Sequence, residues 1–255
     1  MTVAWSDEIG SFATRWRAAS SDLRAVAIER ECELGRAARR SCDACAVNVR
    51  EHLRGRYGPQ LDGLRALAAL VAIMWAVELV NLLDGYRLDS NGIVPRSVSH
   101  LDGIVFAPFL HASISHILGN TIPLVILGFA IALAGARRLL TVTAIVAVVS
   151  GLGVWLIAPA HTDTVGASGV VFGYATYLIS RGLFNRRLAE VALGVLVAVL
   201  FGGALIADLV PHAGVSWQAH LFGGIGGVLA ASALSAGPRE RKRERAAGVA
   251  TPVVR

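Results

Sequence analysis

The sequence predicts an all-α membrane protein with six spanning helices. Of its 255 residues, 55% are hydrophobic and only 16% are charged, whereas an ordinary soluble domain carries about 25% charged residues. Six apolar stretches are long enough to cross most or all of a hydrocarbon core about 30 Å thick. The arginines fall between these stretches. This spacing is typical of membrane loops and excludes a nucleic-acid-binding groove.

Three domains follow from the composition. Residues 1–63 are polar and rich in arginine and glutamate, which predicts a small cytosolic helical segment that ends near Pro59. Residues 64–236 hold the six apolar stretches and form the transmembrane domain, and residues 237–255 are a basic cytosolic tail that we expect to be disordered. Because the N-terminus is polar, no cleavable signal peptide is predicted, and internal spans are expected to insert the chain.

The expected spans are the six runs of apolar residues. They are Leu64–Leu83, His116–Ala134, Leu139–Ala158, Gly166–Ser180, Leu188–Val210 and Val215–Ala236. The fourth is the shortest, at about fifteen residues, and should cross the bilayer buried among its neighbours. The connection from Asp84 to about Leu110 is long and apolar, so we expect it to lie in the outer leaflet or to pack on the bundle as short interfacial helices.

The arginine clusters predict the orientation of the spans. An even number of spans places both termini on one side. The clusters lie on that side too: Arg137 and Arg138, Arg181 to Arg187, and Arg239 to Arg245. The positive-inside rule therefore predicts a multi-pass plasma-membrane protein with cytoplasmic termini.

Four polar residues stand near the same end of the even-numbered spans. His116 and Asn120 begin the second span, Ser168 begins the fourth, and His220 lies near the start of the sixth. Polar side chains inside a bilayer are costly and mark functional sites. Their convergence at one depth predicts a site near the outer face.

These four residues have the chemistry of a serine hydrolase. Ser168 follows Gly166 at the entry to a helix, where free backbone amides and the helix dipole favour an oxyanion. His220 could take the proton of the hydroxyl and return it as a general acid. His116 and Asn120 are four residues apart, so both project from one helix face as hydrogen-bond donors.

Each residue also has an ordinary structural explanation. Ser168 could cap a helix, and a histidine in a span could simply make an interhelical hydrogen bond. The glycines favour the combined interpretation, because small residues four apart let two helices approach closely. Such pairs occur in both spans, as Gly169 and Gly173 in the fourth and Gly223 and Gly227 in the sixth.

These motifs resemble those of the rhomboid family of intramembrane serine proteases. The matching pieces are His111 to Asn120 on the second span, Gly166-Ala-Ser-Gly169 on the fourth, and Ala219-His220 followed by Gly223 and Gly227 on the sixth. The likeness covers about residues 64–236, and the motifs stand in the family's order on the family's second, fourth and sixth helices.

The resemblance implies a role for each of these residues. Ser168 would be the nucleophile and His220 its base, a dyad without a carboxylate, while His116 and Asn120 would hold the oxyanion. His111 would organise the outer connection rather than do chemistry. The glycines would allow close approach: Gly166 at the entry to the fourth span, with Gly169 along it, and Gly223 and Gly227 on the sixth.

The sequence departs from the family pattern at two places. Bacterial members often carry a hydroxylated aromatic residue stacked on the catalytic histidine, and Phe172 stands at that position, so stacking is expected without the hydroxyl. Many members have a Trp-Arg pair in the first outer connection, where this chain has Asp102 and Gly103. We expect altered anchoring of that connection.

The resemblance implies an endopeptidase that cleaves transmembrane segments of other membrane proteins near the outer face, without a cofactor. Its partners would be those substrates and the lipid bilayer, with no nucleic acid. The alternative is a catalytically silent relative that binds membrane helices. A small transporter would require internal repeats or ionisable residues at the midplane, and no repeat is found.

Two features lie outside this scheme. Cys32, Cys42 and Cys45 with His52 could hold zinc, but their helix-like surroundings lack the usual paired knuckles, so no metal site is predicted. Glu78 in the first span has no assigned role, and we expect it to face the bundle and make a hydrogen bond.

Overall fold

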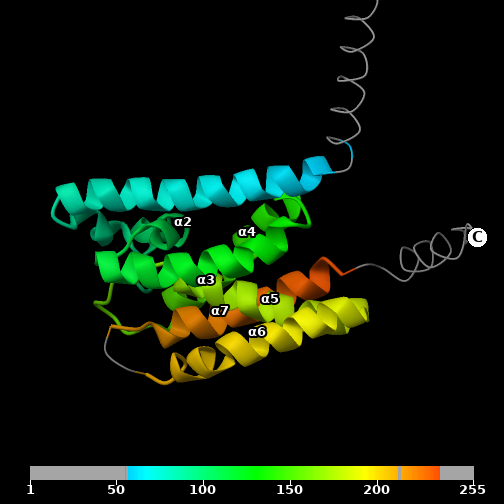
Figure 1. Ribbon diagram of the computed structural model, residues 1–255. Coiled ribbons are helices and arrows are strands. Elements are labelled where there is room, and N and C mark those ends of the chain that lie inside the picture. Colours follow the sequence, from blue (N-terminus) through cyan, green and yellow to red (C-terminus); the bar gives the residue numbers. More distant parts are fainter. Residues whose placement is uncertain (1–54, 56, 212–213, 236–255) are drawn as a thin grey trace, which may run out of the picture. The chain divides into compact units, whose positions relative to one another are not determined.

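The computed structural model describes residues 55, 57–211 and 214–235, and this part of the chain is a bundle of helices (Figure 1). The long helices match the six apolar stretches. They are the first helix (Tyr57–Leu83), α3 (Ile114–Ala132), α4 (Ala136–Ile157), α5 (Ser168–Asn185), α6 (Leu188–Ala207) and α7 (Trp217–Ala233). The all-α prediction is confirmed. Within the described residues, the one extended pairing is an isolated bridge between Ile93 and Thr164.

Four of these helices are long and apolar enough to cross a membrane. They are the first helix, α3, α4 and α6. The other two, α5 and α7, have 18 and 17 residues. Both pack closely against longer helices, as we expected for the short fourth span.

The first helix begins earlier than predicted. It starts at Tyr57 instead of Leu64, because Pro59 fits the first turn of a helix, where its missing N–H has no partner to lose. A boundary between two units of the chain lies at this point, and the bundle belongs to the unit that begins at Pro59. Most of the predicted N-terminal segment, its three cysteines and the basic tail lie outside the described residues.

Helix α5 runs to Asn185 instead of ending at Ser180. The sequence places Arg181 in a connection, but its side chain is only 20% exposed and pairs with Glu190 of α6 at 3.1 Å. A paired arginine can remain in a helix, which explains the longer element.

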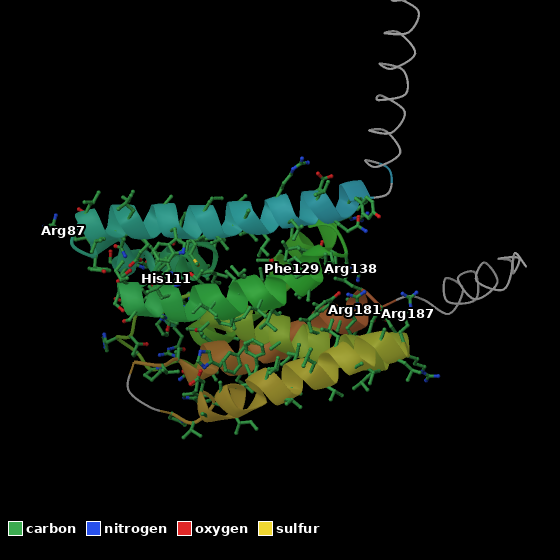
Figure 2. The ribbon with its side chains drawn as sticks, viewed as in Figure 1. Arg87, His111, Phe129, Arg138, Arg181 and Arg187 are labelled. Atoms are coloured by element: carbon green, nitrogen blue, oxygen red, sulfur yellow. The ribbon has the colours of Figure 1, made fainter. Side chains whose placement is uncertain are left out.

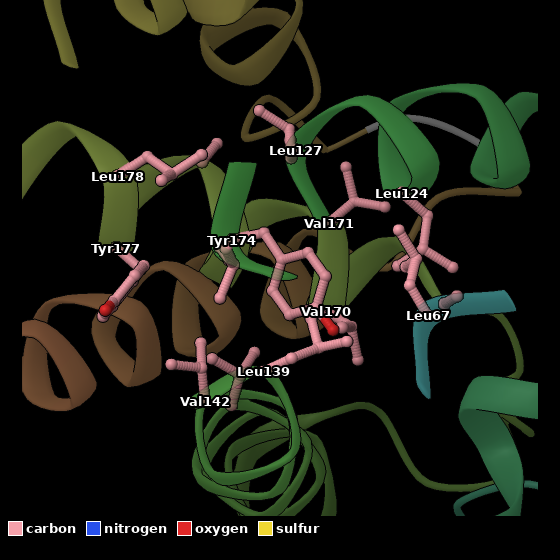
Figure 3. Close-up of a cluster of buried hydrophobic side chains, with 14 of the residues drawn as sticks. Leu67, Leu124, Leu127, Leu139, Val142, Val170, Val171, Tyr174, Tyr177 and Leu178 are labelled. Atoms are coloured by element: carbon pink, nitrogen blue, oxygen red, sulfur yellow. The ribbon is translucent and has the colours of Figure 1, made fainter. Parts of the chain in front are cut away.

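Helix α5 is the centre of the bundle. Twelve of its 18 residues are buried, and its apolar residues occupy all sides of the helix, as expected for a helix surrounded by others. Figure 3 shows Tyr174 among side chains from the first helix, α3 and α4. The first helix joins this core through α3, where Trp75 Nε1 donates to Thr121 Oγ1 at 3.1 Å.

The connection between the first helix and α3, residues 84–113, folds into short helices, as predicted. They are η1 (Arg87–Asn91), η2 (Val98–His100), α2 (Gly103–Phe106) and η3 (Ala107–Phe109). Ile104 and Ala107 are buried, and a Cβ on Gly151 of α4 would meet the Ile104 side chain. We call residues 84–113 the first connection.

Arg96 anchors the first connection to the end of α4. Its guanidinium donates to the main-chain oxygens of Leu156 and Ala158, at 3.3 and 2.9 Å. Trp155 Nε1 in turn donates to the oxygen of Ser97 at 3.0 Å. A cation at the C-terminal carbonyls of a helix interacts favourably with the helix dipole. The first connection is therefore anchored by its own Arg96 together with a tryptophan of α4.

Three arginines gather at one end of the bundle. Figure 2 shows Arg138, Arg181 and Arg187 at one end, and Arg87 and His111 at the other. The second end is the one at which α3, α5 and α7 begin, and we call it the site end.

Candidate active site

Helix α5 begins at Ser168 without a side-chain cap. Its N-cap residue, Ala167, makes no side-chain hydrogen bond, and Gly166 has a φ of 116°, which suits glycine. By contrast, the hydroxyls of Ser113 and Ser216 cap α3 and α7. The explanation of Ser168 as an N-cap is therefore wrong, and its hydroxyl is not used to satisfy the helix end.

The segment that leads into α5 is held by the first connection. The amide of Thr164 donates to Ile93 O at 3.1 Å and the amide of Gly166 donates to Ala107 O at 2.8 Å. The amide of Ala167 donates to His111 Nε2 at 3.4 Å. Three amides are thus bonded before Ser168, which fixes the entry to the helix.

His116 and Asn120 lie on α3 beside Gly166. A Cβ placed on Gly166 would lie 2.7 Å from His116 Nε2 and 3.4 Å from Asn120 Nδ2. Asn120 is buried, and its Nδ2 has no hydrogen-bond partner among the described residues. Preorganised hydrogen-bond donors beside a reacting group can stabilise the oxyanion that develops there.

His220 is buried in α7, and two contacts orient its ring. Nδ1 donates to the main-chain oxygen of Asp208, at 2.9 Å. A carbonyl has no proton to give, so Nδ1 carries the hydrogen and Nε2 is the nitrogen that can accept one. The Phe172 ring stacks on the imidazole with centroids 4.1 Å apart and planes 5° apart. Phe172 lies one turn after Ser168, so both project from the same face of α5.

Helices α5 and α7 meet through their backbones. A Cβ on Gly223 would collide with the carbonyl of Gly169, and one on Gly227 would collide with the carbonyl of Gly173. This is the close approach that the glycine spacing indicates. It holds the helix of Ser168 against the helix of His220.

His111 lies between the first connection and α3. Its ring packs edge-on against His116, with centroids 5.0 Å apart. Burial, followed by the neighbouring His116, lowers the pKa of His111 to about 4. A neutral ring can accept the hydrogen bond from Ala167, whereas a protonated one cannot.

Glu78 faces the bundle, as predicted, and is only 1% exposed. Neither carboxylate oxygen has a hydrogen-bond partner within the described ranges. The hydrogen bond that we expected is therefore not found in this part of the chain.

Two cavities lie next to these residues. One, of about 650 Å³, is lined by His116 and by residues of the later connections and the start of α7, among them the polar Asp163, Ser216 and Gln218. The other, of about 420 Å³, is apolar, lies between α5, α6 and α7, and reaches Phe172 and His220. Polar groups and apolar space thus adjoin at the site end.

Some positioning groups are missing from the sequence-based prediction. The carbonyl of Asp208 has no sequence signal, because every residue has one. Ser150 of α4, which donates to Ala219 O at 2.8 Å, resembles many other serines in spans. Asn81 could have been found from the sequence, since an amide in an apolar helix needs hydrogen-bond partners when it is buried.

In the described part of the chain, no three His, Cys, Asp or Glu residues are grouped to hold a metal.

The apolar helices and the polar site end define a polytopic helical membrane protein. A model of the rhomboid domain matches residues 99–237, so the chain belongs to the rhomboid family. The uncharacterized protein Rv1337 of Mycobacterium tuberculosis is 42% identical over 194 residues, which cover 73% of this chain and 81% of that protein. The uncharacterized protein ML1171 of Mycobacterium leprae is equally similar, over 77% of its length.

A more distant relative comes from Bacillus subtilis. YdcA is 28% identical over 174 residues, which cover 64% of this chain and 83% of that protein, and its name assigns it provisionally as a rhomboid protease.

Proposed function

We propose that this protein is an intramembrane serine endopeptidase, with Ser168 as the nucleophile and His220 as the general base. The observation that carries the proposal is the orientation of His220: its Nδ1–H is bonded to the Asp208 carbonyl, and its ring is stacked on Phe172. This leaves the basic Nε2 as the ring nitrogen that can accept the proton of Ser168. Two further observations support it: the Ser168 side chain does not cap its helix, and the chain belongs to the rhomboid family.

The first chemical step is acylation. As Ser168 Oγ attacks the scissile carbonyl carbon, its proton moves to His220 Nε2, and the carbonyl oxygen becomes an oxyanion. Asn120 Nδ2, His116 and the amides at the start of α5 stabilise that charge. The tetrahedral intermediate then breaks the C–N bond. His220 gives its proton to the leaving amine, and an acyl-enzyme remains.

The second step is deacylation by water. His220 Nε2 takes a proton from the water as its oxygen attacks the ester, and the same proton returns to Ser168 Oγ when the ester bond breaks. The products are a free carboxyl group and the restored serine. The cavity beside His116 can supply this water, since its lining includes polar side chains that hydrogen-bond.

The Asp208 carbonyl serves as the orienting group for the dyad. In a triad a carboxylate holds the tautomer of the base and stabilises its charged form. A carbonyl fixes the same tautomer, and its dipole stabilises the imidazolium to a smaller extent. The proposed dyad therefore needs no acidic side chain beside His220.

The proposed substrates are transmembrane segments of other membrane proteins. We place the site end at the outer face of the plasma membrane and both termini in the cytoplasm, because Arg138, Arg181 and Arg187 gather at the opposite end (Figure 2). A segment that unwinds near its outer end can present an extended peptide to the site. Its apolar residues remain in the bilayer.

The test compares Ser168→Ala with the wild type in proteoliposomes, using a model transmembrane substrate and a fluorophosphonate probe. Cleavage and labelling should both fall to background in Ser168→Ala. Ser90→Ala, an exposed serine of the first connection, should behave as the wild type. Cleavage that persists without Ser168 would overturn the proposal. A wild type that neither cleaves nor reacts would identify a silent, helix-binding member of the family instead.

A further inference from the structure

A second polar cluster lies at the site end of the first helix. Asn81 is completely buried. Its Nδ2 donates to Asp89 Oδ1 at 2.8 Å and to the main-chain oxygen of His111 at 3.3 Å, while its Oδ1 accepts the amide of Leu88 at 3.1 Å. The Leu88 amide can only donate and the His111 carbonyl can only accept, so these partners fix the orientation of the Asn81 amide.

Asn81 therefore joins the first helix to two parts of the first connection. One is the turn η1, through Leu88 and Asp89, and the other is His111 at the connection's far end. The Asn81 main-chain oxygen adds a bond from the amide of Tyr86 at 2.7 Å. A polar side chain inside a membrane helix is costly and marks a function, so one that donates twice and accepts once has a specific task.

His111 carries the connection onward to the site. Asn81 holds its main-chain oxygen, and its Nε2 accepts the amide of Ala167, the residue before Ser168. The same ring packs against His116. Only two hydrogen bonds separate the Asn81 side chain from the residue next to the proposed nucleophile.

Asp89 brings a carboxyl group into this cluster. Burial raises the pKa of Asp89, while the hydrogen bond from Asn81 and the neighbouring His116 oppose that increase. Asn81 thus holds the partly buried carboxyl group of Asp89 close enough to His116 for the two side chains to interact electrostatically. The cluster reaches both proposed halves of the site, the entry to α5 and the oxyanion donors.

We propose that Asn81 is a positioning residue for the peptidase: by holding His111 it fixes the Ala167 amide and the His116 ring, and with them the geometry of attack at Ser168. The inference rests on the proposed function and adds a residue of the first helix to it. Asn81 touches neither the substrate nor the reacting atoms. Its effect is on geometry, where a displacement of about 1 Å can reduce the rate about 100-fold.

The kinetic test compares Asn81→Leu with the wild type in proteoliposomes, with kcat expressed per fluorophosphonate-reactive molecule. We expect kcat to fall about 10- to 100-fold and KM to change less than about twofold. A merely structural role would lower the fraction of reactive molecules and leave kcat per reactive molecule unchanged, which would overturn the proposal. If Asn81→Leu does not fold, Asn81→Gln takes its place, since it keeps the amide but displaces it by one methylene.

The matched control is Asn91→Ala. Asn91 is an exposed asparagine whose Nδ2 donates to the oxygen of Leu88, in the same turn, at 3.0 Å. It does not reach His111, so its loss should leave kcat within about twofold of the wild type. An equal fall in both variants would show that η1 as a whole, and not Asn81, matters.

Hydrogen exchange provides a readout that does not depend on activity. In Asn81→Leu, the peptide containing Ala167 should exchange at least about tenfold faster than in the wild type, and in Asn91→Ala it should not change. Unchanged exchange at Ala167 would overturn the positioning role even if the protein is a peptidase. If exchange responds but the wild type does not cleave, the proposed function fails while the mechanical link stands.

Discussion

Helices α5 and α6 are neighbours in the chain but differ in how they are held. In α5, 12 of 18 residues are buried, whereas in α6 only Gly194 and Val197 of 20 are. Both helices are apolar, so apolarity does not account for the difference. In lipid, close packing comes from small residues that let backbones approach, because lipid is as apolar as a leucine side chain.

The glycines of the two helices show the same difference. Gly169 and Gly173 of α5 lie between α4 and α7: a Cβ on either would collide with a side chain of α4, Ser150 or Val146, and would press on a main-chain oxygen of α7. A Cβ on Gly202 or Gly203 of α6 would meet nothing within 4 Å. Helix α6 touches α5 mainly near its start, through Gly194. Its later part leaves the apolar cavity next to His220. The bundle therefore combines a rigid pair that holds the site with a loosely packed helix beside it.

The largest effect is expected from a substitution that separates α5 from α7. Gly223→Ala places a methyl group against the carbonyl of Gly169, so the helices must separate. We expect a loss of about 3 kcal/mol or more in stability and loss of cleavage. Gly202→Ala, the same change in α6, should be neutral or stabilise by up to about 1 kcal/mol. Thermal unfolding in detergent checks both, and equal shifts in the two variants would refute the distinction.

The second prediction concerns pH and the entry to α5. Folding lowers the pKa of His111 to about 4 from its ordinary value of 6.5, so the unfolded chain binds this proton first. Stability from this group is complete above about pH 6.5 and is lost as the pH falls toward 4, by about 2 kcal/mol at pH 5. Unfolding measured at several pH values, for the wild type and for His111→Gln, checks this. If the wild type and His111→Gln lose stability equally, His111 is not responsible.

The third prediction tests the stacking between α5 and α7. Phe172→Leu removes the ring from His220 and should reduce the rate of cleavage about fivefold, the equivalent of about 1 kcal/mol. Phe172→Tyr should retain the rate, because it keeps the ring. Phe129→Leu, in the half-exposed part of α3, serves as the control. If Phe172→Leu cleaves at the wild-type rate, the stacking of Phe172 on His220 does not contribute to cleavage.

The smallest effect is expected at the anchor of the first connection. Arg96→Ala loses two bonds to carbonyls at the end of α4, and a partly exposed site of this kind contributes about 1 kcal/mol. Arg87→Ala should change stability much less, because its pair with Asp84 is long, at 3.8 Å, and exposed. Thermal unfolding of the two variants gives the comparison. A larger loss for Arg87→Ala would contradict the assigned anchor.

Much of the fold could be predicted from the sequence because membranes impose strong local rules. A stretch of apolar residues must be a helix when no water is present to satisfy the backbone, so hydropathy alone predicted six helices close to their observed bounds. The end of the fourth span was predicted wrongly, because the charged Arg181 was interpreted as the end of the helix. Arg181 remained in α5 because Glu190, on another helix, pairs with it, and no local pattern shows that.

The placement of the candidate residues on neighbouring helices could be predicted where the spacing carries a signal. Ser168, His220, His116 and Asn120 stand at span starts, and the glycines repeat every four residues, so their convergence follows from helix geometry. Only the tertiary structure decided how these residues are oriented. The Asp208 carbonyl sets the tautomer of His220, and Asn81 and His111 hold the amide before Ser168. Such bonds join residues far apart in the chain, and their donors and acceptors are too common for a sequence pattern to reveal which will meet.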